Sequence, residues 1–168
     1  YKRQGHGCYN SDSHLNLPIV YKKKSKLYKE DFSLFKNLSS NFMMTAHILY
    51  KNIDPNQIAT FSKSLIKKTI REEIGFKGLL MTDDISMKAI KLNPEDAADK
   101  ALAAGCDLVL HCNGKINEMN RIADKINSKY ELITSSKELE NIFNNEINIS
   151  LREAELNFNE SLNQADLI

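Results

Sequence analysis

Short apolar runs bounded by polar residues or glycine occur three times in this chain, at 41–48, 78–83 and 107–112. Near-continuous hydrophobicity over so few residues is typical of a parallel strand buried on both faces. After each run comes a segment whose apolar residues recur every three to five positions, as they do on the buried face of a helix. The pattern therefore predicts three strands, each followed by a helix.

Local residue preferences set the expected ends of the first two helices. The first covers 61–74 and stops at Gly75, because glycine readily adopts the left-handed conformation that ends helices. The second follows Asn93, a favoured N-cap residue, and has Pro94 at its first position. These signals support helices and not long loops between the strands.

Strands that alternate with helices along a chain form parallel βα units. About three units are present, with a third helix expected at 116–126 and further helices at 131–168. We divide the single expected α/β domain into a loop at 1–20, the βα units at 41–130 and these C-terminal helices. A complete (β/α)₈ barrel would need eight units and roughly 250 residues.

Composition narrows the class of protein. The chain has 168 residues, of which 42% are hydrophobic and 27% charged, as in a globular domain. Its net charge of +1 gives no electrostatic reason to expect nucleic acid or an acidic membrane surface as the partner. The one basic run, at 22–26, follows Pro18 and contains Ser25, which favours a solvated loop.

No stretch of about 18 apolar residues occurs, so no membrane-spanning segment is expected. The three cysteines, Cys8, Cys106 and Cys112, are too sparse for a disulfide framework and indicate a reducing compartment. We therefore expect a cytoplasmic location. No C-x-x-C or H-x₃₋₅-H spacing links the cysteines and histidines, so no metal site is predicted.

The run at 78–83 ends in two carboxylates, Asp83 and Asp84. In α/β folds the chemistry sits at the C-terminal ends of the parallel strands, so a carboxylate there is placed to act as a nucleophile or to bind a ligand. Asp is also a favoured N-cap residue. On the pattern alone, capping of the next helix by Asp83 or Asp84 stays open.

A second candidate site lies in the polar, glycine-containing segment 5–18, which is predicted to be a loop. Asp12 and His14 are two positions apart, which in an extended segment lets the carboxylate hold an imidazole nitrogen and raise its basicity. Histidine gives and takes protons near neutral pH. The alternative is a surface turn in which Asp12 bonds to nearby backbone and His14 has no catalytic role.

Together the two segments resemble family 3 glycoside hydrolases, in the bacterial β-N-acetylglucosaminidase branch of the peptidoglycan-recycling type. GFKGLLMTDDISM, at 75–87, is similar to the nucleophile segment of that branch, and GHGCYNSDSHLNLP, at 5–18, looks like its acid/base loop. FMMTAHILY and ALAAGCDLVL also match. The resemblance, which runs from Gly5 to about Asn113, implies the C-terminal part of a (β/α)₈ TIM-type barrel that is incomplete on its own.

The resemblance also implies roles for particular residues. In the family the first Asp of the pair is the nucleophile, which is Asp83 here, and the acid/base is a loop histidine, which is His14. Asp12 would orient and polarise His14. The implied reaction is a retaining two-step hydrolysis that removes terminal β-linked N-acetylglucosamine and needs no cofactor. Contacts with the sugar are expected from four further residues, Lys2, His6, His47 and Asp84. Asp84 is also expected to be a supporting or capping group.

The sequence departs from the family pattern at its start. The family's sugar-binding Lys-His pair is Tyr1-Lys2 here, Gln4 replaces a proline, and the first barrel strands have no counterpart. Three hypotheses follow: a glycosidase acting on N-acetylglucosamine-containing sugars or muropeptides, an inactive truncated or split-gene fragment, or a non-catalytic sugar-binding module. A second chain that supplies the missing strands would cover the open strand edges and apolar helix faces.

Overall fold

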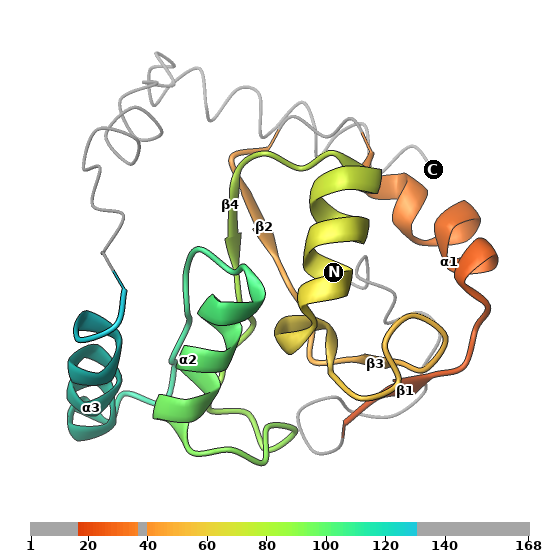
Figure 1. Ribbon diagram of the computed structural model, residues 1–168. Helices are drawn as coiled ribbons and strands as arrows, with labels where there is room; N and C mark the ends of the chain where they lie inside the picture. The colour runs from red at the N-terminus through yellow and green to blue at the C-terminus, as the bar shows by residue number, and fades with distance from the viewer. Residues whose placement is uncertain (1–16, 37–39, 131–168) are drawn as a thin grey trace, which may run out of the picture. The chain divides into compact units, whose positions relative to one another are not determined.

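The computed structural model describes residues 17–36 and 40–130 (Figure 1). Most of the loop predicted at 1–20 and all of the helices predicted at 131–168 lie outside these residues. In the part that is described, no helix is long and apolar enough to cross a membrane.

Parallel strand pairing is the basis of the fold. β2 (Phe42–Met44) pairs in parallel with β4 (Leu79–Met81), and Met81 forms a further parallel bridge to Leu108. The chain between β2 and β4 forms helix η4 (Leu65–Ile74), and the chain between β4 and Leu108 forms helix α2 (Pro94–Ala104). These crossovers confirm the predicted α/β class with parallel βα units.

The strands are shorter than the sequence predicts. The run at 41–48 yields β2, after which the Ile48 amide donates to the Ala46 carbonyl at 2.9 Å. This tight turn ends the first pairing, and β3 (Leu49–Tyr50) then pairs with a different strand. In the run at 107–112, Leu108 forms the bridge to Met81. The later residues of this run make polar contacts in place of regular strand pairing, as the Cys112 amide does with the Asp84 carboxylate.

Two predictions for the N-terminal third are wrong. Residues 19–20 of the expected loop form β1 (Ile19–Val20), which pairs in parallel with β3 and is too short to show a periodic pattern. The basic run at 22–26 is not a solvated loop, because α1 (Lys24–Glu30) begins within it. Leu27, fully buried, anchors this helix, and Lys22 forms ion pairs with Glu30 and Asp31 at 2.7 and 2.8 Å.

The three predicted helices are present with ends close to those expected. They are η4 (Leu65–Ile74), α2 (Pro94–Ala104) and α3 (Ile116–Asn127). Two short 3₁₀ segments, η2 (Phe32–Phe35) and η3 (Ala59–Phe61), precede η4. Helix η4 winds as a π-helix and ends at Gly75, whose φ is +81°. Asn93 caps α2, accepting a hydrogen bond from the Asp96 amide at 2.8 Å.

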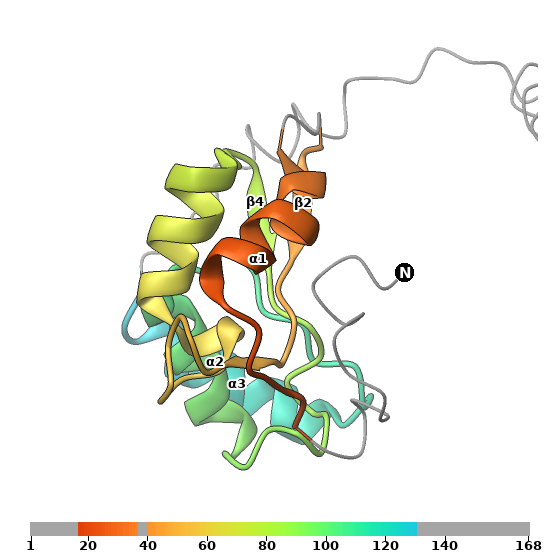
Figure 2. The ribbon, with the colours of Figure 1, turned by 90° about the vertical axis from the view of Figure 1, so that its right-hand side faces the viewer.

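The core lies between the strands and the helices that cover them. Figure 2 shows η4 and α2 on the same side of the paired strands β2 and β4. Leu80 of β4 and Ile66 of η4 are both buried. Three small residues of α2, Ala97, Ala98 and Ala101, are fully buried, and their size lets the helix pack closely against the core. Burying this apolar surface is the main favourable contribution to folding.

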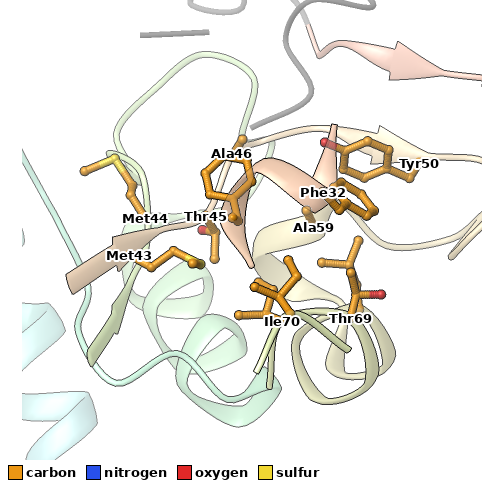
Figure 3. Close-up of a pocket in the computed structure, with 12 residues that line it drawn as sticks. Phe32, Met43, Met44, Thr45, Ala46, Tyr50, Ala59, Thr69 and Ile70 are labelled. Atoms are coloured by element: carbon orange, nitrogen blue, oxygen red, sulfur yellow. The ribbon is translucent and has the colours of Figure 1, made fainter. Parts of the chain in front are cut away.

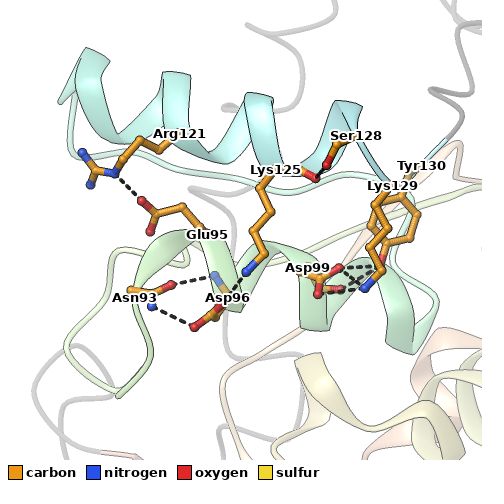
Figure 4. Close-up of polar contacts among 9 residues, drawn as sticks. All are labelled: Asn93, Glu95, Asp96, Asp99, Arg121, Lys125, Ser128, Lys129 and Tyr130. Atoms are coloured by element: carbon orange, nitrogen blue, oxygen red, sulfur yellow. Dashed lines mark hydrogen bonds and ion pairs between the residues drawn. The ribbon is translucent and has the colours of Figure 1, made fainter.

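Polar contacts join helix α3 to α2, as Figure 4 shows. Ile122 is the buried residue of α3. Two basic side chains of α3, and Lys129 just beyond its end, meet acidic residues of α2 in three ion pairs, Arg121–Glu95, Lys125–Asp96 and Lys129–Asp99. Exposed ion pairs contribute little individually, and salt screens them. Because several such pairs join α3 to α2, we expect α3 to be the helix whose attachment depends most on salt concentration.

An apolar pocket of about 50 Å³ lies between β2 and the segments η2 and η4 (Figure 3). Its walls include Phe32, Met43 and Ile70, with the two hydroxyl residues Thr45 and Thr69. Both hydroxyls are bonded elsewhere, Thr45 to Thr60 and Thr69 to Tyr28. Tyr50 also lines this pocket, and the other lining residues carry no titratable side chain, so the pocket has no carboxylate, imidazole, amine or thiol for acid, base or nucleophilic chemistry.

Candidate active site

The candidate nucleophile Asp83 lies just beyond the C-terminal end of β4. Thr82, before it, is fully buried, and its amide donates to the Leu108 carbonyl at 3.0 Å. The Thr82 hydroxyl oxygen accepts a hydrogen bond from the Leu110 amide at 2.9 Å. These two bonds connect the end of β4 to the neighbouring segment, so Asp83 leaves a fixed backbone.

The carboxylate of Asp83 is half-buried and lightly engaged. Its Oδ1 accepts a hydrogen bond from the Asp84 amide at 2.8 Å. Within residues 17–36 and 40–130, Oδ2 has no hydrogen-bond partner. With respect to these residues, Oδ2 is therefore available to act as a nucleophile.

Asp84 has a different environment, because its carboxylate is fully engaged. Oδ1 accepts hydrogen bonds from the Ser86 amide at 2.9 Å and from the Cys112 amide at 3.0 Å, and the Ser86 hydroxyl donates to Oδ2 at 2.6 Å. Burial alone would raise the pKa of this carboxyl. The hydrogen bonds from Ser86 and Cys112, with His111 nearby, outweigh burial and hold the pKa below its usual value. Asp84 is therefore ionised at neutral pH.

Neither aspartate caps a helix. The next helix is α2, ten residues on, and its N-cap is Asn93. Asp84 instead begins a turn, in which its carbonyl accepts a hydrogen bond from the Met87 amide at 3.2 Å. Capping of the next helix, left open by the sequence, is thus wrong, while the supporting role expected of Asp84 stays a prediction.

His47 is buried, with 2% of its surface exposed. Its Nδ1 lies 2.8 Å from the Thr60 hydroxyl oxygen, and its Nε2 lies 2.9 Å from the backbone carbonyl oxygen of Asp84. The structure thus brings His47 and the Asp83–Asp84 pair together. The expected contact between His47 and a sugar stays a prediction.

The other four predicted site residues lie outside the described residues. They are the acid/base pair and two expected sugar contacts: Asp12, His14, Lys2 and His6. Of the seven residues predicted from the sequence, the structure therefore places Asp83, Asp84 and His47.

Several polar residues around the pair were not predicted. Thr82 and Ser86 flank the aspartates, and Thr60 contacts His47 from a distant part of the chain. Their signal in the sequence is weak, because single hydroxyl residues next to apolar runs are common. Only the position of Thr82 and Ser86 beside two carboxylates marks them.

The cysteines and His111 complete the surroundings. Burial, followed by the charges of Asp84 and Asp83, raises the pKa of the exposed Cys112 thiol. Burial raises the pKa of Cys106 to about 12, so that thiol is inert. His111 Nε2 lies 3.1 Å from Glu118 Oε2. In the described ranges, no group of three or more histidine, cysteine and acidic residues is arranged to hold a metal ion.

Comparison with known proteins places this geometry in a family. The model of the glycosyl hydrolase family 3 N-terminal domain matches residues 4–142. A β-hexosaminidase from Shewanella frigidimarina is 36% identical over 118 residues, which cover 67% of this chain and 34% of that protein. One from Nitrosospira multiformis is 38% identical over 114 residues, 65% of this chain and 32% of that protein. The chain thus spans about a third of the length of these relatives.

Solved structures of other proteins are also similar to this chain. NagZ from Neisseria gonorrhoeae has a TM-score of 0.59 and 30% identity, with 76% of this chain and 35% of that one covered. CbsA from Thermotoga neapolitana has a TM-score of 0.64 and 32% identity, with 73% of this chain and 30% of that one covered. The match of the family model over most of the chain, together with these relatives, shows that this chain belongs to the family of the glycosyl hydrolase family 3 N-terminal domain.

Proposed function

We propose that this chain carries the nucleophile half of a retaining glycosidase site that removes terminal, non-reducing β-linked N-acetylglucosamine. The observation that supports this most directly is the position of Asp83, which extends from the buried Thr82 at the end of β4. The relatives named β-hexosaminidase supply the class of substrate. Muropeptides or cell-wall fragments, and a cytoplasmic location, belong to this proposal.

In the proposed mechanism Asp83 Oδ2 attacks the anomeric carbon and forms a glycosyl-enzyme ester as the bond to the leaving oxygen breaks. His14, polarised by Asp12, protonates that oxygen and then takes a proton from the water that cleaves the ester. Asp84 keeps its charge and holds the turn. Because it accepts hydrogen bonds from Ser86 and Cys112, its carboxylate is less available to attack than that of Asp83.

We further propose that the described parallel units form the C-terminal part of a (β/α)₈ barrel. The helices on one side of β2 and β4, and the solved family members that the chain matches, support this arrangement. A barrel needs eight strands to close. A second chain, or a longer form of this one, would then supply the others, and turnover by this chain alone is expected to be low.

The test uses the full chain and an aryl N-acetylglucosaminide. Asp83→Ala is expected to abolish release of the aryl group, and azide should restore it by attacking the anomeric carbon in place of the carboxylate, which gives a glycosyl azide of inverted (α) configuration. Asp84→Asn, the matched control, should keep measurable turnover because its side-chain oxygen still accepts hydrogen bonds. Unchanged turnover in Asp83→Ala would remove Asp83 as nucleophile.

The alternative is an inactive fragment, and the share of its relatives that the chain spans supports it. Sedimentation and thermal unfolding distinguish the two. An inactive fragment predicts a partly folded or oligomeric sample without turnover, whereas a monomer that unfolds cooperatively and releases the aryl group excludes it. A sugar-binding module would show binding of N-acetylglucosamine by calorimetry without turnover.

A further inference from the structure

We propose that His47 is a positioning residue whose Nε2–H fixes the turn carrying Asp83, by donating a hydrogen bond to the Asp84 carbonyl. The importance of this turn for catalysis rests on the proposed function. The hydrogen bond and its effect on the turn do not.

The chemistry of the contact determines which nitrogen carries a proton. A backbone carbonyl oxygen only accepts hydrogen bonds, so Nε2 of His47 must be protonated whatever the charge of the ring. The 2.9 Å separation between Nε2 and that oxygen is ordinary for such a bond. His47 therefore acts on the turn as a donor.

The ring is held from its other side by a buried hydroxyl. Thr60 Oγ1 lies 2.8 Å from His47 Nδ1, and Thr60 is fully buried. The same hydroxyl lies 3.1 Å from Thr45 Oγ1 and 3.2 Å from the Ala46 carbonyl oxygen. Because Thr60 belongs to η3 and the other residues follow β2, two separate segments fix the orientation of the imidazole.

His47 completes a turn that is otherwise held on one side. The Asp84 carbonyl also accepts a hydrogen bond from the Met87 amide at 3.2 Å, and the Ile85 amide donates to the Leu110 carbonyl at 3.0 Å. The second of these bonds comes from the segment after Leu108. His47 supplies the support from the β2 side. A reactive carboxylate must be held within a fraction of an ångström to work well, and Asp83 lies directly before this turn.

A sugar contact would compete with this role. Both ring nitrogens of His47 are engaged and the side chain is buried. A bond from either nitrogen to a substrate would compete with the partner that this nitrogen has among the described residues. His47 therefore acts on Asp83 indirectly, through the turn, and not by direct contact with a sugar.

The first experiment compares His47→Leu with His47→Gln in the full chain by amide hydrogen exchange. Leucine removes the donor at similar size, whereas the glutamine amide still donates. The amides of Ile85 and Met87 should exchange about tenfold faster in His47→Leu, as expected for one lost hydrogen bond. They should stay near the wild-type rate in His47→Gln, and the Leu79 amide of β4 should change in neither. Unchanged turn amides, or equal loss at Leu79, would overturn the proposal.

The second experiment needs no variant, so it tests the proposed hydrogen bond even if His47→Leu does not fold. The nitrogen-15 shifts of His47 in the wild-type chain should show a protonated Nε2, and a bare Nε2 would contradict the proposal. Where turnover is measurable, His47→Leu should lower kcat and leave KM nearly unchanged. If Asp83→Ala keeps turnover while the exchange result holds, the proposed function fails and the positioning role stands.

Discussion

The carboxylate of Asp84 accepts a hydrogen bond from the backbone amide of Cys112 at 3.0 Å, which joins the turn after β4 to the segment following Leu108. These two residues are far apart in the sequence. The bond closes the edge where the candidate nucleophile lies, and it makes the stability of that edge depend on the charge of Asp84.

Replacement of Asp84 by alanine should destabilise the chain by about 1–3 kcal/mol, because the amides of Ser86 and Cys112 lose a charged, half-buried acceptor. Urea unfolding at neutral pH measures this loss. Asp84→Asn keeps an acceptor oxygen and should lose less. Equal stability of wild type and Asp84→Ala would show that water replaces the carboxylate at no cost.

The lowered pKa of Asp84 also predicts how stability depends on pH. A group whose folded-state pKa lies below its unfolded value of 3.8 contributes stability above that value, and loses it as the pH falls through the folded-state pKa. The difference in unfolding free energy between wild type and Asp84→Asn should therefore be constant at neutral pH and shrink below pH 3.8. A difference that persists unchanged through this range would contradict the assignment.

Gly78→Ala should disturb the start of the β2–β4 pairing. A Cβ atom at Gly78 would lie 2.4 Å from the backbone oxygen of Asn41, which cannot move without shifting β2. We expect a loss of about 2 kcal/mol or more, within the range for overpacked positions. Gly75→Ala is a useful comparison, since a Cβ there has open space but a φ of +81°. Its cost, about 1 kcal/mol, is conformational alone, and Gly78→Ala should exceed it.

The helices were the most predictable part of the fold, because their ends depend on neighbouring residues. Asn93, Pro94 and Gly75 act as the sequence predicts. Strand pairing was less predictable, since β1 has two residues and gains its partner β3 only in the folded chain. The basic run became part of α1 because Leu27 is buried against distant segments, and no local pattern showed that contact.

The candidate site likewise has a part that the sequence predicts and a part that it does not. Asp83 and Asp84 follow an apolar run, a local signal that places them at the end of β4. The contact between His47 and the Asp84 carbonyl joins positions 37 residues apart. Nothing in a single sequence specifies such a contact, so the sequence marks His47 as a candidate without showing how its nitrogens are used.

High salt should loosen α3 before the rest of the described fold. The ion pairs Lys125–Asp96 and Lys129–Asp99 are partly exposed, so salt screens them, whereas the apolar core is not weakened. Amide exchange in α3 should be faster at about 1 M salt than at low salt, with little change at Leu80. In Lys125→Met and Lys129→Met together, exchange should be fast at both salt concentrations. Equal salt sensitivity of the wild type and this double variant would show that the pairs do not hold α3.

Alkylation of Cys112 reports directly on the charges of the aspartate pair. Its thiol is exposed, and burial together with the carboxylates of Asp84 and Asp83 raises its pKa above the usual 9.0. Since the thiolate is the reactive form, iodoacetamide should label Cys112 slowly at pH 8, and the rate should keep rising as the pH passes 9.0. Removing either charge lowers the thiol pKa, so both Asp83→Asn and Asp84→Asn should label faster than wild type at pH 8.

Peptide mass spectrometry separates this label from those on the other cysteines, and buried Cys106, whose pKa is about 12, should stay unlabelled in the folded chain. A faster rate in Asp84→Asn alone would place the Asp83 carboxylate away from the thiol. Faster labelling in both variants, with Cys106 still protected, would show that both carboxylates lie close enough to the Cys112 thiol to raise its pKa.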